Sequence, residues 1–310
     1  MDDGLIDFHG QTAIVTGAGH GLGRSHALAL AERGAAVVCN DIDDAAARAT
    51  VSSIAERGGR AVAETSSVAS PDGGAAIVEA ALEAFGSIEV VVNNAGQLRN
   101  APFADMSAED FREVLDTHLV GAFHLTQCAY RHMVTAGYGR IVFTSSSALL
   151  GSPWQANYAA AKGGLVGLSH VVAAEGAPHG ITANVIMPMA LTAMGGSGPP
   201  PYSPDELRAV TEALRPLARH LTVENVSPLV VHLASRHCTL TRQTFLVGGG
   251  HVARVVVGVT RGWYADDLVM PSPEEVAAHL DEAGDLTGLT EPRSMNDATR
   301  SIGDRLPPAR

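Results

Sequence analysis

Residues 12–31 read Thr-Ala-Ile-Val-Thr-Gly-Ala-Gly-His-Gly-Leu-Gly-Arg-Ser-His-Ala-Leu-Ala-Leu-Ala and combine a short apolar run, a glycine-rich turn and a helical pattern. The run Ala13–Val15 is typical of a buried parallel strand. Glycines follow at alternate positions from Gly17 to Gly23, and apolar side chains then recur at helical spacing. A helix that begins behind such a turn presents free N–H groups and the positive end of its dipole, and glycine lets a phosphate approach the backbone. The stretch therefore predicts a phosphate-binding strand–turn–helix unit.

Short apolar runs and helical patterns alternate along the chain as far as residue 250. This alternation predicts an α/β fold, a doubly wound Rossmann-type parallel sheet of about seven strands with helices on both faces. We expect one catalytic and cofactor-binding domain over residues 1–250 and a C-terminal extension over 251–310. Further strands are expected at 35–39, 61–63, 90–92, 141–143, 183–186 and 244–247, and helices at 43–57, 72–85, 110–135, 158–174, 205–214 and 227–233.

Composition limits the classes of protein to which the chain can belong. Its 310 residues carry a formal charge of −12, which argues against nucleic acid or an anionic membrane as a partner because both need a basic surface. No apolar run reaches the roughly 18 residues of a membrane span, and no secretory leader is evident. The three cysteines are scattered, which favours reduced thiols and a cytoplasmic location. The histidines show no metal-ligand spacing, so no metal is expected.

Asp41 ends the second predicted strand, 24 residues after Gly17. A carboxylate at this position accepts hydrogen bonds from ribose hydroxyls and repels a 2′-phosphate. No arginine stands beside it at positions 40 or 42, so NAD is favoured over NADP. The alternative role, capping the next helix, suits Asp43 better.

Tyr158 and Lys162 are four residues apart, so both side chains lie on one face of a predicted helix. A free phenol has a pKa of about 10, which is too high for a base at neutral pH. A lysine ammonium one turn away and a positively charged nicotinamide would both lower that pKa. The spacing therefore predicts a tyrosine that takes or gives the proton of an alcohol during hydride transfer.

The spacing Thr16-Gly17-x-x-x-Gly21-x-Gly23, followed by Asn93-Asn94-Ala95-Gly96 and Tyr158-x-x-x-Lys162, resembles the short-chain dehydrogenase/reductase family over about residues 8–250. The resemblance implies an NAD(P)-dependent oxidoreductase that acts on CH–OH groups, in which Lys162 also holds the nicotinamide ribose. It implies cofactor contacts from Gly17, Gly21, Leu22, Gly23, Asp41, Ser67, Val68, Asn94, Ala95, Gly96, Tyr158, Lys162, Pro188, Met189 and Thr192.

Several of these positions depart from the family pattern or leave alternatives open. Ser67 stands where an aspartate is usual, and Met189 follows Pro188 where a glycine is usual. Asn94 either touches the cofactor or mainly ties strands together. His118 replaces the usual asparagine of the long helix. It either joins the proton relay or only packs while its backbone carbonyl holds a water.

The resemblance also requires a serine that holds the substrate oxygen, and two candidates follow the fifth strand. Counting back from Tyr158 by the usual family spacing gives Ser145. Counting forward from the start of the strand gives Ser146. The loop that follows appears one residue short against the family pattern, and we therefore prefer Ser146.

Within the family, His118, the run Gln155–Tyr158 and the C-terminal extension resemble the (R)-3-hydroxyacyl-CoA dehydrogenase units of peroxisomal multifunctional enzymes type 2 and their stand-alone bacterial relatives. The implied substrate is a 3-hydroxyacyl-CoA, and a hydroxysteroid is the close alternative. A catalytically silent NAD-binding sensor is the alternative from another class. The resemblance also implies a homodimer or homotetramer. The extension is expected to add a strand at 252–257 and a helix near 272–282, as a dimer element or a substrate-groove wall.

Overall fold

The computed structural model describes residues 5–191, 196–197, 203–265 and 268–304. The chain forms two compact units, Met1–Arg254 and Val255–Arg310. None of the described helices is long and apolar enough to cross a membrane.

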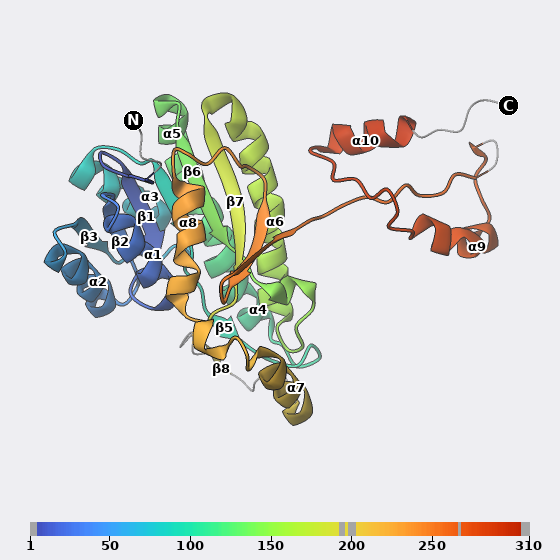
Figure 1. Cartoon of the computed structure of the whole chain (residues 1–310), viewed down its shortest axis with the longest axis horizontal. Coiled ribbons are helices and arrows are strands. Elements are labelled where there is room, and N and C mark those ends of the chain that lie inside the picture. Colours follow the sequence, from blue (N-terminus) through green and yellow to red (C-terminus); the bar gives the residue numbers. More distant parts are fainter. Residues whose placement is uncertain (1–4, 192–195, 198–202, 266–267, 305–310) are drawn as a thin grey trace. The chain divides into compact units, whose positions relative to one another are not determined.

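An eight-stranded sheet forms the centre of the first unit, with strand order β10-β9-β7-β6-β4-β1-β2-β3 (Figure 1). All pairs from β3 to β9 in this order are parallel, which confirms the predicted doubly wound fold. A separate parallel pair joins β5 (Leu98–Arg99) to β8 (Gly196–Ser197). The strands of the large sheet are β1 (Thr12–Thr16), β2 (Ala36–Asn40), β3 (Arg60–Glu64), β4 (Val90–Asn93), β6 (Gly139–Thr144), β7 (Ile181–Pro188), β9 (Thr244–Gly248) and β10 (His251–Val255).

The eighth strand, β10, begins where the extension was expected to begin. Only Gly249 and Gly250 separate it from β9, and their φ angles of 59° and 79° are those of a tight hairpin turn. A connection this short joins antiparallel strands. The added strand is therefore an edge strand of the main sheet.

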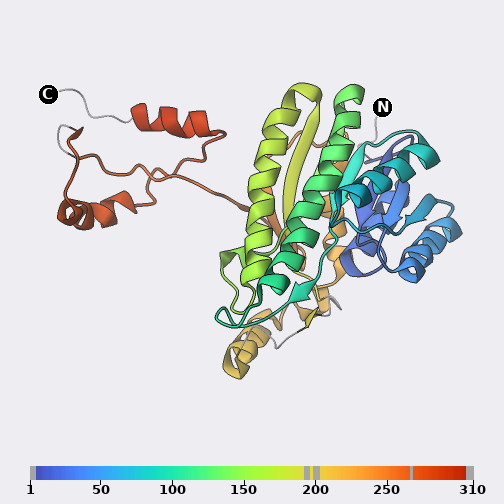
Figure 2. The ribbon, with the colours of Figure 1, turned by 180° about the vertical axis from the view of Figure 1, so that it is seen from behind.

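Helices cover both faces of the sheet (Figures 1 and 2). One apolar cluster packs α1 and α8 against one face, and a second packs α3, α5 and α6 against the other. The helices of the first unit are α1 (Gly21–Ala31), α2 (Asp44–Glu56), α3 (Pro71–Phe85), α4 (Ala108–Leu115), α5 (Gly121–Ala136), α6 (Ala156–Gly176), α7 (Pro204–Leu214) and α8 (Ser227–Ala234).

The helix expected to run unbroken over 110–135 is interrupted. A π-helical turn, Asp116–Val120, lies between α4 and α5. Such turns insert one extra residue and are frequent at functional sites. Here the turn carries His118, whose side chain is only 2% exposed. A repeating apolar pattern does not reveal one inserted residue, so the prediction of a continuous helix was wrong in this detail.

The second unit contains α9 (Pro273–Ala283) and α10 (Met295–Gly303). A capping box between Ser272 and Glu275 begins α9, close to the expected start at residue 272. Neither helix has a buried residue, and Trp263 stacks on His279 with ring centroids 4.2 Å apart. Large apolar side chains therefore stay exposed within this unit, including Leu280, Leu286, Met295 and Ile302.

Thr16 joins the carboxyl ends of β1 and β4. Its buried hydroxyl accepts hydrogen bonds from the backbone N–H groups of Asn94 and Ala95, both at 3.0 Å. The Asn94 amide donates in turn to the Thr16 carbonyl at 3.0 Å. The turn after β4 is thereby fixed against the glycine turn after β1.

We expect Thr16→Val to lower the free energy of unfolding by about 1 kcal/mol, because it leaves two partly buried backbone N–H groups without an acceptor. Chemical denaturation measures the change. Thr12→Val is the matched control, since Thr12 is equally buried in β1 and its hydroxyl only approaches Ser87 Oγ at 3.4 Å. Equal losses in both variants would contradict the assigned role of Thr16.

Candidate active site

Tyr158 and Lys162 lie in the first turns of α6, beside the carboxyl end of β6. Lys162 is 3% exposed, and its ammonium group donates to the carbonyl of Thr144, the last residue of β6. Its Nζ lies 5.3 Å from the centroid of the Tyr158 ring. Burial lowers the pKa of Lys162 to about 7. Burial also raises the pKa of Tyr158, and a hydrogen bond with Ser146 opposes that rise. A positive charge in an adjoining cofactor site would lower the Tyr158 pKa further.

The two candidate serines have different surroundings. Ser145 is 1% exposed, and its hydroxyl donates to the Lys162 carbonyl at 2.8 Å. Ser146 is half-buried and hydrogen-bonds Tyr158. Its hydroxyl also accepts the N–H of Ala148 at 3.2 Å. The geometry thus assigns Ser145 to the support of α6 and places Ser146 beside the tyrosine, where a substrate oxygen would bind.

His118 packs against Tyr158 edge to face, with ring centroids 5.1 Å apart and an interplanar angle of 82°. Its Nε2 lies 3.0 Å from the Gln97 nitrogen and 2.8 Å from the Gln97 carbonyl oxygen. Burial, and secondarily the charge of Lys162, holds the pKa of His118 well below its usual value, so the ring is neutral. A Cβ at Gly96 would come within 2.1 Å of the ring, so only glycine fits there. The buried Nδ1 has no hydrogen-bond partner among the described residues and can bind one further group.

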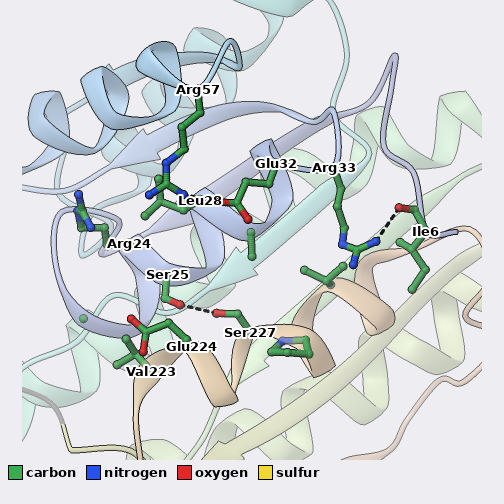
Figure 3. A pocket seen from close by; sticks show the side chains of 14 residues that line it. Ile6, Arg24, Ser25, Leu28, Glu32, Arg33, Arg57, Val223, Glu224 and Ser227 are labelled. Carbon is green, nitrogen blue, oxygen red and sulfur yellow. Dashed lines mark hydrogen bonds and ion pairs between the residues drawn. The ribbon is translucent and has the colours of Figure 1, made fainter.

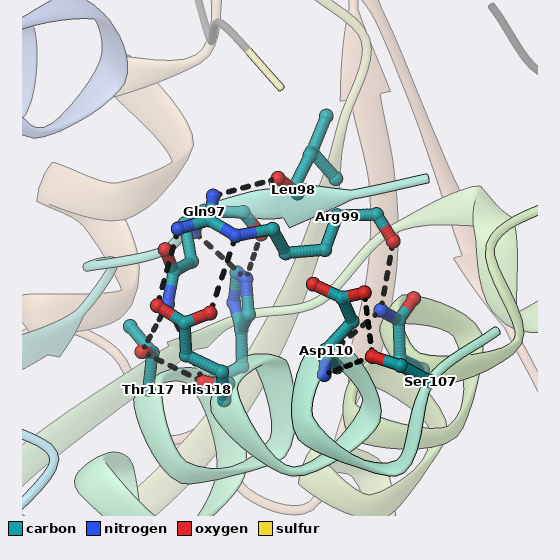
Figure 4. A network of polar contacts seen from close by, with 9 residues as sticks. Gln97, Leu98, Arg99, Ser107, Asp110, Thr117 and His118 are labelled. Atoms are coloured by element: carbon teal, nitrogen blue, oxygen red, sulfur yellow. Dashed lines mark hydrogen bonds and ion pairs between the residues drawn. The ribbon is translucent and has the colours of Figure 1, made fainter. Parts of the chain in front are cut away.

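Figure 4 shows the polar network that surrounds this histidine. It contains Asn157, a residue that sequence reasoning did not assign to the site. Its fully buried amide donates to the carbonyls of Arg99 at 2.9 Å and Asp110 at 3.2 Å, and its oxygen accepts the Tyr158 N–H at 2.7 Å. Asn157 therefore fixes the start of α6 to β5 and α4. A polar residue in a first helical turn is a weak signal, because such residues are common there.

Part of the predicted cofactor set lines a cavity of about 400 Å³ at the carboxyl ends of β1, β2 and β4. Gly17, Asp41, Val68, Ala95 and Gly96 all line it.

Asp41 accepts the Gly19 N–H at 2.9 Å and the Asp43 N–H at 3.0 Å. Asp43, as expected, caps α2 through the N–H of Ala46. The Asp41 carboxylate is thus held at the cavity wall and does not cap the helix.

The glycine turn also fits a dinucleotide phosphate. Gly17 and Gly21 have φ angles of 65° and 50°. A Cβ at Gly23 would lie 2.1 Å from the Gly17 carbonyl oxygen, so the start of α1 packs tightly against the turn. The residue before α1, His20, makes no side-chain cap, which leaves the first N–H groups of the helix for an anion.

The other predicted cofactor residues differ in whether their polar groups are free to contact a cofactor. Asn94 bonds the Thr16 backbone, which favours its strand-tying role. Ser67 lines the same cavity and is exposed, while Leu22 is buried in the core. The Met189 N–H is already bonded to Val247 at 2.7 Å, beyond Pro188 at the end of β7. Thr192 lies outside the described residues.

A larger hollow of about 720 Å³ lies between α1 and α8 (Figure 3). Arg24, Arg33 and Arg57 line it, and each already donates to a neighbouring oxygen. Of the motif residues only Gly21 reaches this hollow. The predicted cofactor residues therefore favour the cavity beside Asp41 over this hollow.

Known proteins are similar to this chain in sequence and in fold. The model of the short chain dehydrogenase family matches residues 11–197. The chain belongs to this family. A short-chain type dehydrogenase/reductase of Mycobacterium tuberculosis is 42% identical over 285 residues, 89% of this chain and 94% of that protein. Peroxisomal multifunctional enzyme type 2 of Mus musculus is 38% identical over 312 residues, 97% of this chain and 40% of the mouse protein. A solved short chain dehydrogenase from Mycobacterium avium has a TM-score of 0.75 at 37% identity, covering 89% of this chain and 95% of that one.

Membership makes the chain an oxidoreductase that acts on CH–OH groups, in a family that uses nicotinamide cofactors. The predicted family and fold class are confirmed. The roles of the individual site residues stay predictions, supported by the geometry described above.

We expect Ser146→Ala to lower kcat by about 10²- to 10³-fold, because it removes the hydroxyl that would hold the reacting oxygen. Ser145→Ala should cost about 1 kcal/mol of stability through its lost bond to Lys162 and leave kcat nearly unchanged. Steady-state kinetics and thermal unfolding, measured on both variants with one secondary alcohol, separate the two effects. A larger loss of kcat in the Ser145 variant would reverse the assignment.

Proposed function

We propose that this protein is an NAD-dependent dehydrogenase of secondary alcohols whose substrate is a 3-hydroxyacyl-CoA. The observation that carries the reaction type is the Tyr158–Lys162 pair, in which the Nζ of the buried Lys162 lies 5.3 Å from the Tyr158 ring and Ser146 hydrogen-bonds Tyr158. Tyr158 also packs on His118, whose Nε2 hydrogen-bonds Gln97 at the wall of the cavity that Asp41 lines. The acyl-CoA substrate rests on the similarity to peroxisomal multifunctional enzyme type 2 along 97% of the chain and on the resemblance of His118 and the run Gln155–Tyr158 to its dehydrogenase unit.

In this mechanism Ser146 holds the substrate hydroxyl and Tyr158 takes its proton as the carbon–oxygen double bond forms. A bound nicotinamide would supply the hydride acceptor for the carbinol carbon, or the hydride donor in the reverse direction. Lys162 is the electrostatic partner of Tyr158, because its ammonium charge, 5.3 Å from the ring, would lower the pKa of the phenol. Thr144 fixes the Lys162 ammonium group, and the neutral His118 ring holds Tyr158 from the side.

The test is NADH formation with a panel of 3-hydroxyacyl-CoA thioesters, hydroxysteroids and small secondary alcohols. We expect the thioesters to give the highest kcat/KM. Tyr158→Phe should lower kcat by about 10²- to 10⁴-fold and leave NAD binding intact.

Each remaining outcome identifies an alternative function. A preference for steroids would replace the proposed substrate. NAD binding without turnover of any alcohol would replace the enzyme with a silent sensor.

The preference for NAD rests on Asp41, whose carboxylate lines the cavity where the adenosine ribose would bind. We expect Asp41→Ala to weaken NADH binding and to narrow the difference between NADH and NADPH, since the variant no longer repels a 2′-phosphate. Fluorescence titration with both cofactors measures the ratio. Asp43→Ala is the control, because it removes an equal charge and the α2 cap but no cavity wall. A parent protein that prefers NADPH would contradict the proposal.

We also propose that the protein works in the cytoplasm as a homodimer or homotetramer. The outer side of α6 supports this assembly. Gly163 and Gly167 lie one turn apart there, and a Cβ at either would meet no atom within 4 Å. A glycine surface of this kind permits close approach of a second helix. Val171, one turn further, is 55% exposed. The role of residues 251–310 as dimer element or groove wall belongs to the same proposal.

A further inference from the structure

The turn that leads into α6 contains a residue in a conformation that its type disfavours. Residues Ser152–Gln155 form a β-turn, in which the Gln155 N–H donates to the Ser152 carbonyl at 3.3 Å. Pro153 occupies the second position and Trp154 the third, with a φ of 63°. A proline followed by a positive φ is the pattern of a type II turn, whose third position is normally glycine. A bulky side chain is a genuine outlier there.

Hydrogen bonds from outside the turn hold Trp154 in this conformation. The Ala101 N–H donates to the Trp154 carbonyl at 3.0 Å, and the Gln155 amide donates to the Asn100 side chain at 3.2 Å. Two residues later, Asn157 binds the Arg99 carbonyl. The segment 99–101 thus fixes the turn at three points, and the backbone does not follow the preference of the tryptophan. Strained residues of this kind cluster at ligand sites.

The turn belongs to one of three loops that leave the carboxyl ends of strands and carry exposed or half-buried apolar side chains. Trp154 is half-buried four residues before Tyr158, in the loop that follows Ser146. Phe103, Leu150 and Leu191 are 85%, 72% and 71% exposed, and they lie in the segments that follow β5, β6 and β7. These segments leave the carboxyl ends of the strands, where ligands bind in open α/β sheets. Exposed apolar side chains on the loops at this end of the sheet indicate an apolar ligand.

We propose that Trp154 determines substrate specificity, and that its indole forms the wall against which the distal part of the substrate's apolar chain packs. This inference rests on the proposed function. It adds the residue that selects substrates by the length of their apolar chain. It also explains the strain: a glycine would satisfy the turn and would present no wall to the ligand.

The experiment compares Trp154→Ala, Trp154→Gly and Trp154→Phe with the parent protein on a short-chain and a long-chain 3-hydroxyacyl-CoA. We expect the alanine and glycine variants to raise KM for the long chain by about 10-fold or more and to leave kcat and the short-chain KM nearly unchanged. The phenylalanine variant should recover most of the long-chain affinity, because it restores an aromatic wall. Melting temperature checks the strain separately. The glycine variant should melt about 2 °C above the alanine variant, since only alanine retains a Cβ at positive φ.

Three results would overturn the inference. Equal losses on both chain lengths would show that Trp154 only supports the fold. A change in oligomeric state by light scattering, together with the kinetic loss, would show that it contacts a second copy. Unchanged kinetics in all variants would show that the indole meets no substrate. If the parent oxidises other secondary alcohols and no acyl-CoA, the proposed substrate fails. The same comparison between small and bulky alcohols then decides the role of Trp154.

Discussion

The tie between the carboxyl ends of β1 and β4 is the constraint on which the rest of the site depends. Thr16 accepts two N–H groups of the turn after β4, and the Asn94 amide returns a bond to the Thr16 carbonyl. Gly17 and Gly23 can then pack backbone against backbone, because no Cβ separates the turn from α1. Gly96 follows in the same turn, and a Cβ there would come within 2.1 Å of the His118 ring. One set of short contacts therefore fixes both the phosphate end of the cofactor cavity and the histidine beside Tyr158.

Burial determines the chemistry of the reacting pair. Lys162 is held in a nearly dry site by the Thr144 carbonyl, so its pKa falls to about 7, and the pKa of the Tyr158 phenol rises for the same reason. Neither shift favours a tyrosinate in an empty site. A positive charge near the phenol would lower the pKa of Tyr158 and so oppose the effect of burial.

The features of the fold and the site that depend on local sequence patterns could be predicted from the sequence. Alternating strands and helices gave the sheet, the glycine spacing gave the phosphate turn, and the Tyr158–Lys162 spacing placed both side chains on one helix face. Ser146 could be preferred to Ser145 only by counting residues, because the distinction depends on which hydroxyl the Lys162 carbonyl engages. The π-helical turn at His118 and the clamp made by Asn157 depend on contacts with residues 96–99. Such contacts join segments far apart in the chain, and the periodicity of neither segment predicts them.

The hydrogen bonds of the Asn157 side chain connect Tyr158 to the segment that follows β7. Arg99 contributes its carbonyl to Asn157, and its strand β5 pairs with β8, where Arg99 lies opposite Ser197. Asn157 in turn accepts the N–H of Tyr158. A continuous path of backbone and amide hydrogen bonds therefore runs from β8 to the first turn of α6. Any displacement of β8 that moves β5 must also disturb a partner of Asn157, and Asn157 is fully buried, with no solvent to replace a lost bond. The position of β8 and the position of the base are thus not independent.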